Sequence, residues 1–456
     1  SRAANVRNLL HEFIAFTGQF ATKRLMESFI RRRWGWHAAA IAGIFLSLQT
    51  SSYSQISFYT APMPSGFSQD VGENETGTTI SEEPGLGAIG GIFARKPFIL
   101  TLAVREGYDS NVFTTPRNPT GSWYTNWAAG ISYAFGGSRL QLNANLGGGL
   151  TYYYTRPGDK VDFNGYLGLG ATYLATPRLT LGFVTRTAYL SQPDLTIVGG
   201  TDRRNGDYFY TNSTVSASYQ WTEVFSTVTS YNFTAFYYVE QELNDNQGRI
   251  EQTVAQSARW LWKPKTTLVA EYRINPVTYY DADLNQLCHY FLLGFDQVFN
   301  PRFFWNVRVG AQVNFNHNPV DGDSTYVGPY GESTLTYAVR KSTTLSWNLR
   351  YGTEASGLYN VTQRQTFRTG LVLNHAFTPR IAGTFAMNYQ CNYYDQARVI
   401  SSFTENIVDF SVGLTFRVNR MVSLQAGYQF TIDVAPDYTG REYNRNIVFA
   451  GANFTF

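Results

Sequence analysis

The side chains of this chain that could bind or select a solute are arginines and carboxylates on one face of alternating segments. In Phe303–Asn316, for example, Arg308 stands between Val307 and Val309. Guanidinium groups bind carboxylates and phosphates through paired hydrogen bonds, and charges that line a pore set its ion preference. Alternation predicts a pore lining of Arg105, Arg186, Arg259, Glu271, Arg273, Asp296, Arg308, Glu332, Arg350, Arg368, Asp409, Arg417 and Asp433.

The same residues could instead form a ladder of ion pairs that braces neighbouring strands, and the two roles are compatible. The set contains eight arginines and five acids, so a channel lined by it is expected to prefer anions mildly. That preference should weaken in salt, because the screening length falls to roughly 3 Å at 1 M.

Catalysis has little support in the sequence. The histidines after the leader, His289, His317 and His375, fall in separate segments, and neither a Gly-x-Ser-x-Gly elbow nor an HExxH motif is present. A nucleophile with its base is therefore not recognisable. The loop His317–Ser324 has closely spaced oxygens but lacks the later Glu of an EF-hand loop. We predict no enzyme activity, no cofactor and no metal site.

The elements that position these residues are β-strands. From residue 98 onward apolar and polar residues alternate, as in Arg139–Tyr153, where Leu140, Leu142 and Ala144 oppose Gln141 and Asn143. A period of two is typical of a strand with one apolar and one polar face. When the apolar face meets lipid and the polar face meets water, this is the pattern of a transmembrane barrel.

The connections between strands alternate between short and long. Short turns such as Gly136–Ser138 and Thr176–Arg178 lie between longer polar loops, eight and nine in number respectively. This predicts an all-β protein, a transmembrane antiparallel up-and-down β-barrel of about 18 strands (about 16–18), over residues 98–456. An even count puts both termini on the periplasmic side. A repeat solenoid does not produce alternating connection lengths.

Composition fits this class. Charged residues make up 15% of the chain and aromatic residues 16%, against about 25% charged residues in a soluble domain. The formal charge is +3, and the basic excess falls in the first 54 residues. No basic patch indicates a nucleic-acid partner.

Residues 1–54 read as an upstream extension followed by a signal peptide. Arg31–Arg33 precede the apolar run Ala38–Leu48, and small residues follow to Ser54. The run is too short to span a bilayer, which needs about 20 residues. Met26 is a natural start, which would make residues 1–25 the extension. Residues 55–97 are turn-rich and acidic, and are predicted to be a periplasmic linker or a partial plug.

The loop Ser191–Asp207 is the longest connection. It carries Asp194, Asp202, Arg203, Arg204 and Asp207 around a Gly199–Gly200 hinge. In porins the third loop folds into the barrel and narrows it, so these residues are candidate constriction residues. The alternative is an ordinary external loop.

The chain ends in an alternating strand, Asn446–Phe456, with Phe454 and Phe456 on its apolar face. This ending resembles the closing strand of bacterial outer-membrane β-barrels, in which the terminal aromatic segment is also the assembly signal. The resemblance implies the outer membrane of a Gram-negative bacterium, membrane lipid as a partner, and the barrel assembly machinery as a second partner.

A second resemblance concerns Glu106-Gly-Tyr-Asp-Ser-Asn-Val-Phe113. This segment is similar to the Tyr-Asp-Ser/Asp-Asn-Val segment near the first strand of the putative β-barrel porin 2 family, whose members often accompany exopolysaccharide-biosynthesis loci. It implies an outer-membrane channel for polar solutes or secreted polysaccharide. The alternatives are a structural or adhesion barrel with a filled lumen and, less favoured, a barrel-embedded enzyme. The sequence does not indicate the solute, the direction of transport or the oligomeric state.

Overall fold

The computed structural model describes residues 98–191, 194–197, 200–203, 206–280, 284–318, 322–358, 361–394, 401–436 and 441–456. The expectations for the leader (1–54) and for the linker or plug (55–97) lie outside these residues.

The described residues form long strands that follow one another along the chain. They are β1 (Phe98–Asp109), β2 (Ser122–Gly136), β3 (Leu140–Tyr153), β4 (Val161–Thr176), β5 (Leu179–Leu190), β8 (Tyr208–Gln220), β9 (Phe225–Tyr238), β10 (Arg249–Lys263), β11 (Thr266–Tyr279), β12 (Asn285–Asn300), β13 (Phe303–His317), β14 (Ser324–Arg340), β15 (Thr343–Leu358), β16 (Val361–Ala376), β17 (Ile381–Tyr394), β18 (Phe403–Arg417), β19 (Val422–Val434) and β20 (Tyr443–Thr455).

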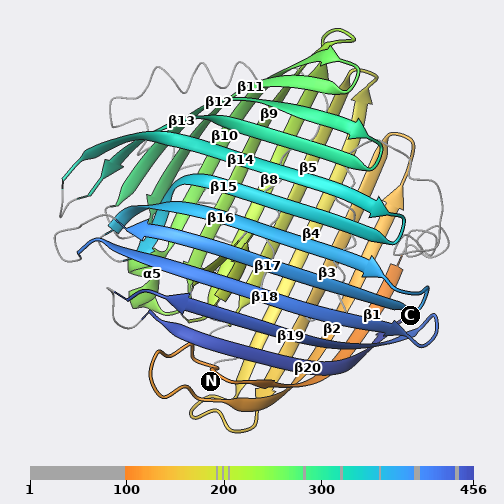
Figure 1. Cartoon of the computed structure of the whole chain (residues 1–456), viewed down its shortest axis with the longest axis vertical. Helices are drawn as coiled ribbons and strands as arrows, with labels where there is room; N and C mark the ends of the chain where they lie inside the picture. Colours follow the sequence, from red (N-terminus) through yellow and green to blue (C-terminus); the bar gives the residue numbers. More distant parts are fainter. Residues whose placement is uncertain are drawn as a thin grey trace. The chain divides into compact units, whose positions relative to one another are not determined.

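These strands build one closed antiparallel sheet (Figure 1). Each strand pairs with the next along the chain, β5 pairs with β8, and β1 pairs with both β2 and β20. Over the described residues the sheet contains 18 strands, which confirms the predicted fold class. The short connections also fall where the sequence predicts them, and so do the longer ones except between β15 and β16, which only residues 359–360 separate. Closure leaves no unpaired sheet edge.

The seam between β1 and β20 is held at both ends. At one end the backbone of Phe456 exchanges two hydrogen bonds with that of Leu100, at 2.8 and 3.2 Å. At the other end the guanidinium of Arg445 donates to the carboxylate of Asp109, with an Nη2–Oδ2 distance of 2.6 Å. The amide of Asn111 also donates to the Asn444 carbonyl. The segment Glu106–Phe113 therefore contributes to barrel closure.

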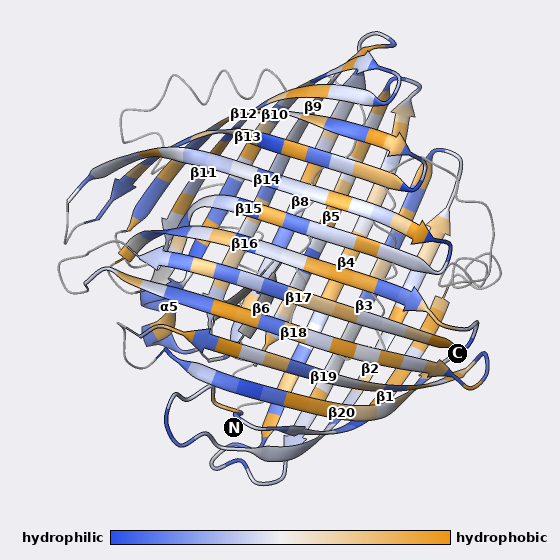
Figure 2. Cartoon of the chain, in the orientation of Figure 1, coloured by the Kyte–Doolittle hydropathy of each residue, from blue (hydrophilic) through white to orange (hydrophobic). Residues whose placement is uncertain are grey.

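The wall has two chemically different faces, and Figure 2 shows hydrophobic and hydrophilic residues alternating along its strands. On β1 the exposed side chains include Leu100, Leu102 and Val104, while Ala103 and Arg105, which alternate with them, are buried. The same alternation runs through β13, where Val309 is exposed and Arg308 is buried. The exposed apolar face suits lipid, and the other face turns inward.

Two smaller elements lie in the loops that flank β8 and β9. The hairpin of β6 (Asp194–Ile197) and β7 (Gly200–Arg203) follows β5, and the helix α5 (Gln241–Gln247) follows β9. The sequence predicts neither element, because both connections read as irregular polar loops. Within the described residues no helix is both long enough and apolar enough to cross a membrane.

Candidate pore wall and constriction

Contacts between strands that are not neighbours identify the inner face. Arg273 on β11 hydrogen-bonds Glu332 on β14, although β12 and β13 lie between these strands. Gln312 on β13 likewise donates to the Thr353 carbonyl on β15 at 2.8 Å. Side chains can meet over intervening strands only on the concave side of a curved sheet. These residues therefore face the barrel interior.

Asp296 is the centre of one buried cluster on this inner face. It lies on β12 and accepts hydrogen bonds from Arg259 on β10 and Arg308 on β13. The Arg308 Nη2–Asp296 Oδ1 distance is 2.8 Å, and all three side chains are buried. The structure brings together three residues that the sequence assigns to one face, and it pairs them.

Glu332 is the centre of a second cluster. Its carboxylate accepts from Arg273 Nη1 at 3.1 Å and from the Tyr330 hydroxyl at 2.6 Å. Arg273 also contacts Glu271 on its own strand. The guanidinium of Arg273 thus lies between two carboxylates, and the ladder alternative describes this part of the wall.

Glu354 on β15 pairs with three arginines. The sequence did not predict Glu354 as a residue of the inner wall. Arg350 lies 3.5 Å from it, Arg364 3.7 Å, and Arg368 Nη1 donates to it at 2.9 Å. Arg368 also donates to Gln390 on β17. The alternation contained a signal for this cluster. Glu354 follows Arg350 by four positions on β15, and Arg364 precedes Arg368 by four positions on β16, so the two residues of each pair share a face. Three guanidiniums therefore share this one carboxylate.

Glu405 on β18 forms a further buried centre. It accepts from Asn392 at 2.7 Å and from the Tyr394 hydroxyl at 3.0 Å, and it pairs with Arg441. Burial alone would lower the pKa of Arg441, but the adjacent Tyr394 and Glu405 raise that pKa above its usual value. Arg441 lies in a loop, where alternation gives no signal, so the sequence analysis did not find it.

Arg105, Asp409 and Asp433 are also buried. Arg105 on β1 lies over the ring of Phe449 on β20, 5.4 Å from its centroid. Asp409 on β18 accepts from the hydroxyl of Thr431 at 2.8 Å, and Asp433 is buried on β19.

Arg186 and Arg417 differ from the other predicted arginines because both side chains are exposed. Arg186 lies on β5 opposite Asn212 of β8, and Arg417 lies on β18 near its short turn. Alternation places both on the inner face, so their exposed guanidiniums face the interior rather than lipid.

Much of the inner wall is neutral. On β8 and β9, Asn212 donates to the Thr234 hydroxyl and Asn232 to the Thr214 hydroxyl, both at 2.8 Å. We call the inner face of β2–β9 the neutral wall and that of β10–β18 the charged wall. Apart from Arg186 on β5 and Asp162 on β4, the neutral wall is built from small polar and aromatic residues that include Asn126, Asn143, Asn145, Asn164, Tyr166, Asn212, Thr214, Ser216, Asn232 and Thr234.

The hairpin in the loop Ser191–Asp207 crosses from one wall to the other. Its strand β7 lies against β16, β17 and β18, although the loop leaves the barrel at β5 and returns at β8. Asp194 begins β6, and Asp202 and Arg203 end β7. Arg204 lies outside the described residues. Asp207, at the base of the loop, accepts from the Tyr189 hydroxyl at 2.8 Å.

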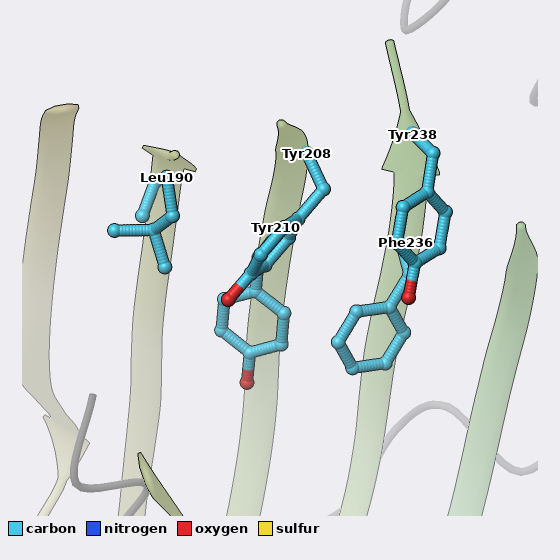
Figure 3. Packing of buried hydrophobic residues seen from close by; sticks show 6 residues of the cluster. Leu190, Tyr208, Tyr210, Phe236 and Tyr238 are labelled. Carbon is cyan, nitrogen blue, oxygen red and sulfur yellow. The ribbon is translucent and has the colours of Figure 1, made fainter. Parts of the chain in front are cut away.

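An aromatic cluster on the neutral wall supports the helix α5. Tyr208 and Tyr210 of β8 pack beside Phe236 and Tyr238 of β9, with Leu190 of β5 next to them (Figure 3). Leu243 of α5 packs on this cluster, and Asn244 accepts from the Tyr238 backbone amide at 3.1 Å. The helix also lies against β11 and β15. The aromatic cluster thus anchors a second element that reaches the charged wall.

Histidines and cysteines are dispersed. Cys288 and Cys391 are free, on β12 and β17. Within the described residues no group of three or more His, Cys, Asp or Glu could hold a metal ion. The barrel histidines hydrogen-bond one neighbouring side chain each: Tyr272 for His289, Asp323 for His317 and Thr343 for His375.

Comparison with solved structures gives matches among outer-membrane proteins of Pseudomonas. OpdK of Pseudomonas aeruginosa, solved with vanillate, is 11% identical with a TM-score of 0.43, covering 79% of this chain and 99% of that chain. A BenF-like porin of Pseudomonas fluorescens Pf-5 is 11% identical with a TM-score of 0.44, at 79% and 99% coverage. OccK2 (OpdF) of Pseudomonas aeruginosa, solved with glucuronate, is 9% identical with a TM-score of 0.43, at 79% and 98%. No curated protein sequence matches the chain.

Comparison with protein families gives one match that bears on the predicted resemblance. Residues 324–456, which include β14 to β20, match the family described as "Putative beta-barrel porin 2". The segment Glu106–Phe113, on which the resemblance was based, lies outside the matched residues. The closed barrel, its apolar outer face and this match agree with one another. The chain is therefore a β-barrel of the bacterial outer membrane, and its C-terminal seven strands match the Putative beta-barrel porin 2 family.

Proposed function

We propose that the protein is a channel through which small polar solutes cross the outer membrane by diffusion. The observation that carries this proposal is the exposure of Arg186 on the inner face of β5. A guanidinium exposed inside a barrel needs water around it, because an ion in a dry, low-dielectric interior is strongly destabilised. The barrel size supports the same conclusion, since barrels of about 16–18 strands enclose an aqueous channel.

We further propose that the charged residues predicted from the sequence act in two ways. Arg186 and Arg417 meet solutes directly and favour anions, whereas the clusters around Asp296, Glu332 and Glu354 brace the charged wall. The exposure of the first two and the burial of the clusters support this division.

The loop Ser191–Asp207 is proposed to narrow the channel. In this proposal Asp194, Asp202, Arg203 and Arg204 surround the narrowest passage. Asp207, also predicted for this role, instead bonds Tyr189, which alternates with the buried inner residues Ala188 and Leu190 and so lies on the outer face. The contact of β7 with β16, β17 and β18 supports it, because a loop that reaches the opposite wall must lie over or within the opening.

Single-channel recording in planar bilayers tests the proposal. The full-length barrel should give a stable ohmic conductance. A variant in which residues 192–205 are replaced by a short Gly-Ser linker should conduct on the order of twice as much, because the obstruction is removed. The matched control replaces Val412 and Leu414, on the outer face of β18, with Ala, and its conductance should stay unchanged. Silence of both wild type and deletion variant would contradict the channel.

A structural barrel with a filled lumen is the second candidate, and one observation favours it. Several inner-face side chains have no exposed surface, among them Gln312, Gln390 and Glu405. A dry, plugged lumen would produce this burial. In that case the deletion variant would stay silent, and Arg186→Cys would resist water-soluble thiol reagents, whereas an open lumen predicts rapid labelling.

Passage of secreted polysaccharide is the finer alternative for the solute, and the family resemblance supports it. Size exclusion by uncharged polymers distinguishes it from passage of small solutes. If linear glucans of several sugar units lower the conductance from either side, the lumen admits a polysaccharide chain. If only mono- and disaccharides enter, the channel serves small solutes.

Two proposals concern biogenesis. Cleavage of the signal peptide should leave a mature chain that starts near Gln55, which the intact mass of the outer-membrane form would reveal. Phe454 and Phe456 are proposed as the signal for the barrel assembly machinery. Phe456 also donates and accepts at the seam. Deletion of Phe456 should reduce the heat-modifiable barrel in outer membranes, and an unchanged amount would refute its role.

A further inference from the structure

Three aromatic side chains of the inner face each stand opposite a glycine of the preceding strand. The pairs in register are Tyr124 of β2 with Gly107 of β1, Tyr166 of β4 with Gly147 of β3, and Phe449 of β20 with Gly427 of β19. We call the three aromatic residues the wall rings. Gly107 alternates with the buried Arg105, and residues in register share a face of the sheet, so Tyr124 faces inward. All three wall rings are half-buried.

The glycines give the wall rings room to lie along the wall. A Cβ atom on Gly107 would stand 2.5 Å from both Cζ and the hydroxyl oxygen of Tyr124. On Gly147 and Gly427 a Cβ atom would meet the other two wall rings about as closely. No side chain fits in these spaces, so each ring leans over the neighbouring strand instead of pointing toward the barrel axis. The side of the ring that is turned away from the wall is left to the interior.

A tyrosine of the charged wall shows the contrast. Tyr330 also lies against a glycine, Gly352. It is only 3% exposed, and its hydroxyl donates to Glu332 at 2.6 Å. Tyr330 is therefore closed to a ligand, whereas the half-buried wall rings keep one side open.

Amide side chains accompany two of the wall rings. Asn126 lies two positions from Tyr124 on the same face of β2, and the same relation holds between Asn164 and Tyr166 on β4. Asn126 is 6% exposed and donates to the Thr151 hydroxyl at 2.9 Å. Its Oδ1 atom has no hydrogen-bond donor among the residues that the structure describes. Because a buried acceptor without a donor is destabilising, this oxygen indicates a donor that comes from outside the chain.

The spacing of the wall rings requires an extended ligand. Phe449 on β20 and Tyr124 on β2 flank β1, so they stand two strand spacings, or roughly 10 Å, apart. On β3, Tyr153 is in register with Tyr124 and Gly147 with Tyr166. Positions 147 and 153 are separated by roughly 20 Å along the strand. The wall rings therefore follow the length of the barrel and do not surround a single small pocket.

We propose that the wall rings form a binding site for a linear oligosaccharide, whose sugar rings stack on them inside the barrel. One side of a pyranose ring presents C–H groups, which are attracted to the negative face of an aromatic ring. The hydroxyls at its edge can donate to an amide oxygen such as Oδ1 of Asn126. This assignment names the substrate class of the proposed channel and rests on that channel, because only an open lumen admits a sugar to these rings.

Two arginines at the loop ends near the wall rings are paired, which favours a sugar over a small carboxylate as the ligand. Arg445 donates to Asp109 at 2.6 Å, and Arg156 donates to Asp162 through two hydrogen bonds of 2.8 Å. A guanidinium that already holds a carboxylate binds a second one weakly, whereas stacking on an aromatic ring needs no charge. The exposed Arg186, on the strand next to β4, can donate to sugar oxygens.

The test uses maltohexaose and cellohexaose, two neutral linear glucans, in two measurements. In planar bilayers the wild-type barrel should show current blockages whose frequency rises with the glucan concentration. Polyethylene glycol of similar size has no sugar ring and should lower the current without resolved blockages. Isothermal titration calorimetry of the barrel in detergent measures the same binding and does not depend on conductance.

Substitutions of the wall rings connect this binding to stacking. Tyr124→Leu with Phe449→Leu keeps apolar side chains but removes two aromatic faces, and should weaken glucan binding about tenfold. Tyr124→Phe keeps the ring and should bind as the wild type does. Phe291→Leu, on the exposed outer face of β12, is the matched control and should leave binding unchanged. The single variant Tyr166→Leu, which should weaken binding about threefold, serves if the double variant does not assemble.

The outcomes separate this site from the channel itself. A conducting wild type that binds neither glucan would overturn the sugar site and leave the channel in place. Leucine variants that assemble and bind as tightly as the wild type would also overturn the site. Glucan binding in calorimetry by a barrel that does not conduct, lost in the leucine variants, would support the site and contradict the channel.

Discussion

The two halves of the inner wall differ in the side chains that line them. The charged wall, on β10–β18, holds its guanidiniums in buried clusters around Asp296, Glu332, Glu354 and Glu405. The neutral wall, on β2–β9, is built mainly from Asn, Ser, Thr and Tyr side chains, and its Arg186 is exposed instead of buried. A buried charge is tolerated only when it is paired and hydrogen-bonded, whereas a neutral amide can exchange partners with water. The charged wall is therefore braced by its ion pairs, whereas the neutral wall can be solvated by water.

Two elements from the neutral side of the barrel lie against the charged wall. The β6–β7 hairpin and α5 both leave loops next to β8 or β9, and both lie against strands of the charged wall. The aromatic cluster around Tyr208 and Tyr238 anchors α5 at its origin. The charged wall is thus the surface that receives these elements, so its rigidity positions the proposed constriction.

The largest expected effect comes from breaking the Asp296 cluster. Asp296→Asn leaves Arg259 and Arg308 buried without their shared carboxylate, so the free energy of unfolding should fall by roughly 3–5 kcal/mol. Unfolding of the refolded barrel in guanidinium chloride, followed by tryptophan fluorescence, measures this loss. A loss below about 1 kcal/mol would mean that water solvates the cluster and that the two walls do not differ in this respect.

A smaller effect is expected on ion selectivity. It is measured by comparing an exposed arginine of the neutral wall with a buried arginine of the charged wall. Arg186→Gln should shift reversal potentials in a salt gradient toward cations. The permeability ratio should change by up to about fivefold, since a charge roughly 4 Å from an ion in water is worth about 1 kcal/mol. Arg308→Gln should shift it less, because Asp296 offsets the charge of Arg308. The opposite order would assign solute contact to the charged wall.

The smallest effect is expected for neutral hydrogen bonds. Asn232→Ala removes its bond to the Thr214 hydroxyl and the bonds that it accepts from Thr234 and Asn212. The free energy of unfolding should fall by about 1–2 kcal/mol, because water can replace neutral partners on a solvated wall. The same denaturant titration gives the value and serves as the reference for Asp296→Asn. If both variants lose equal stability, burial of charge does not set the charged wall apart.

Local pattern was sufficient to predict the barrel. A period of two in the side chains decides which face each residue takes, and Pro- and Gly-containing turns decide where each strand reverses. The strand number and the inner position of residues such as Arg308 follow from these local rules. The predicted arginines and acids could be sorted by face because facing requires no knowledge of the neighbouring strand.

Only the tertiary structure decided which charges meet. Arg273 and Glu332 lie 59 positions apart and are brought together by register and curvature, which no local pattern encodes. Arg441 reaches Glu405 from a loop, and Asp109 meets Arg445 through closure of the first strand on the last. The sequence by itself determined a barrel with an apolar outside and a polar inside. Register and closure decided that its charges are mostly paired, because pairing depends on distances between strands and not on positions along one.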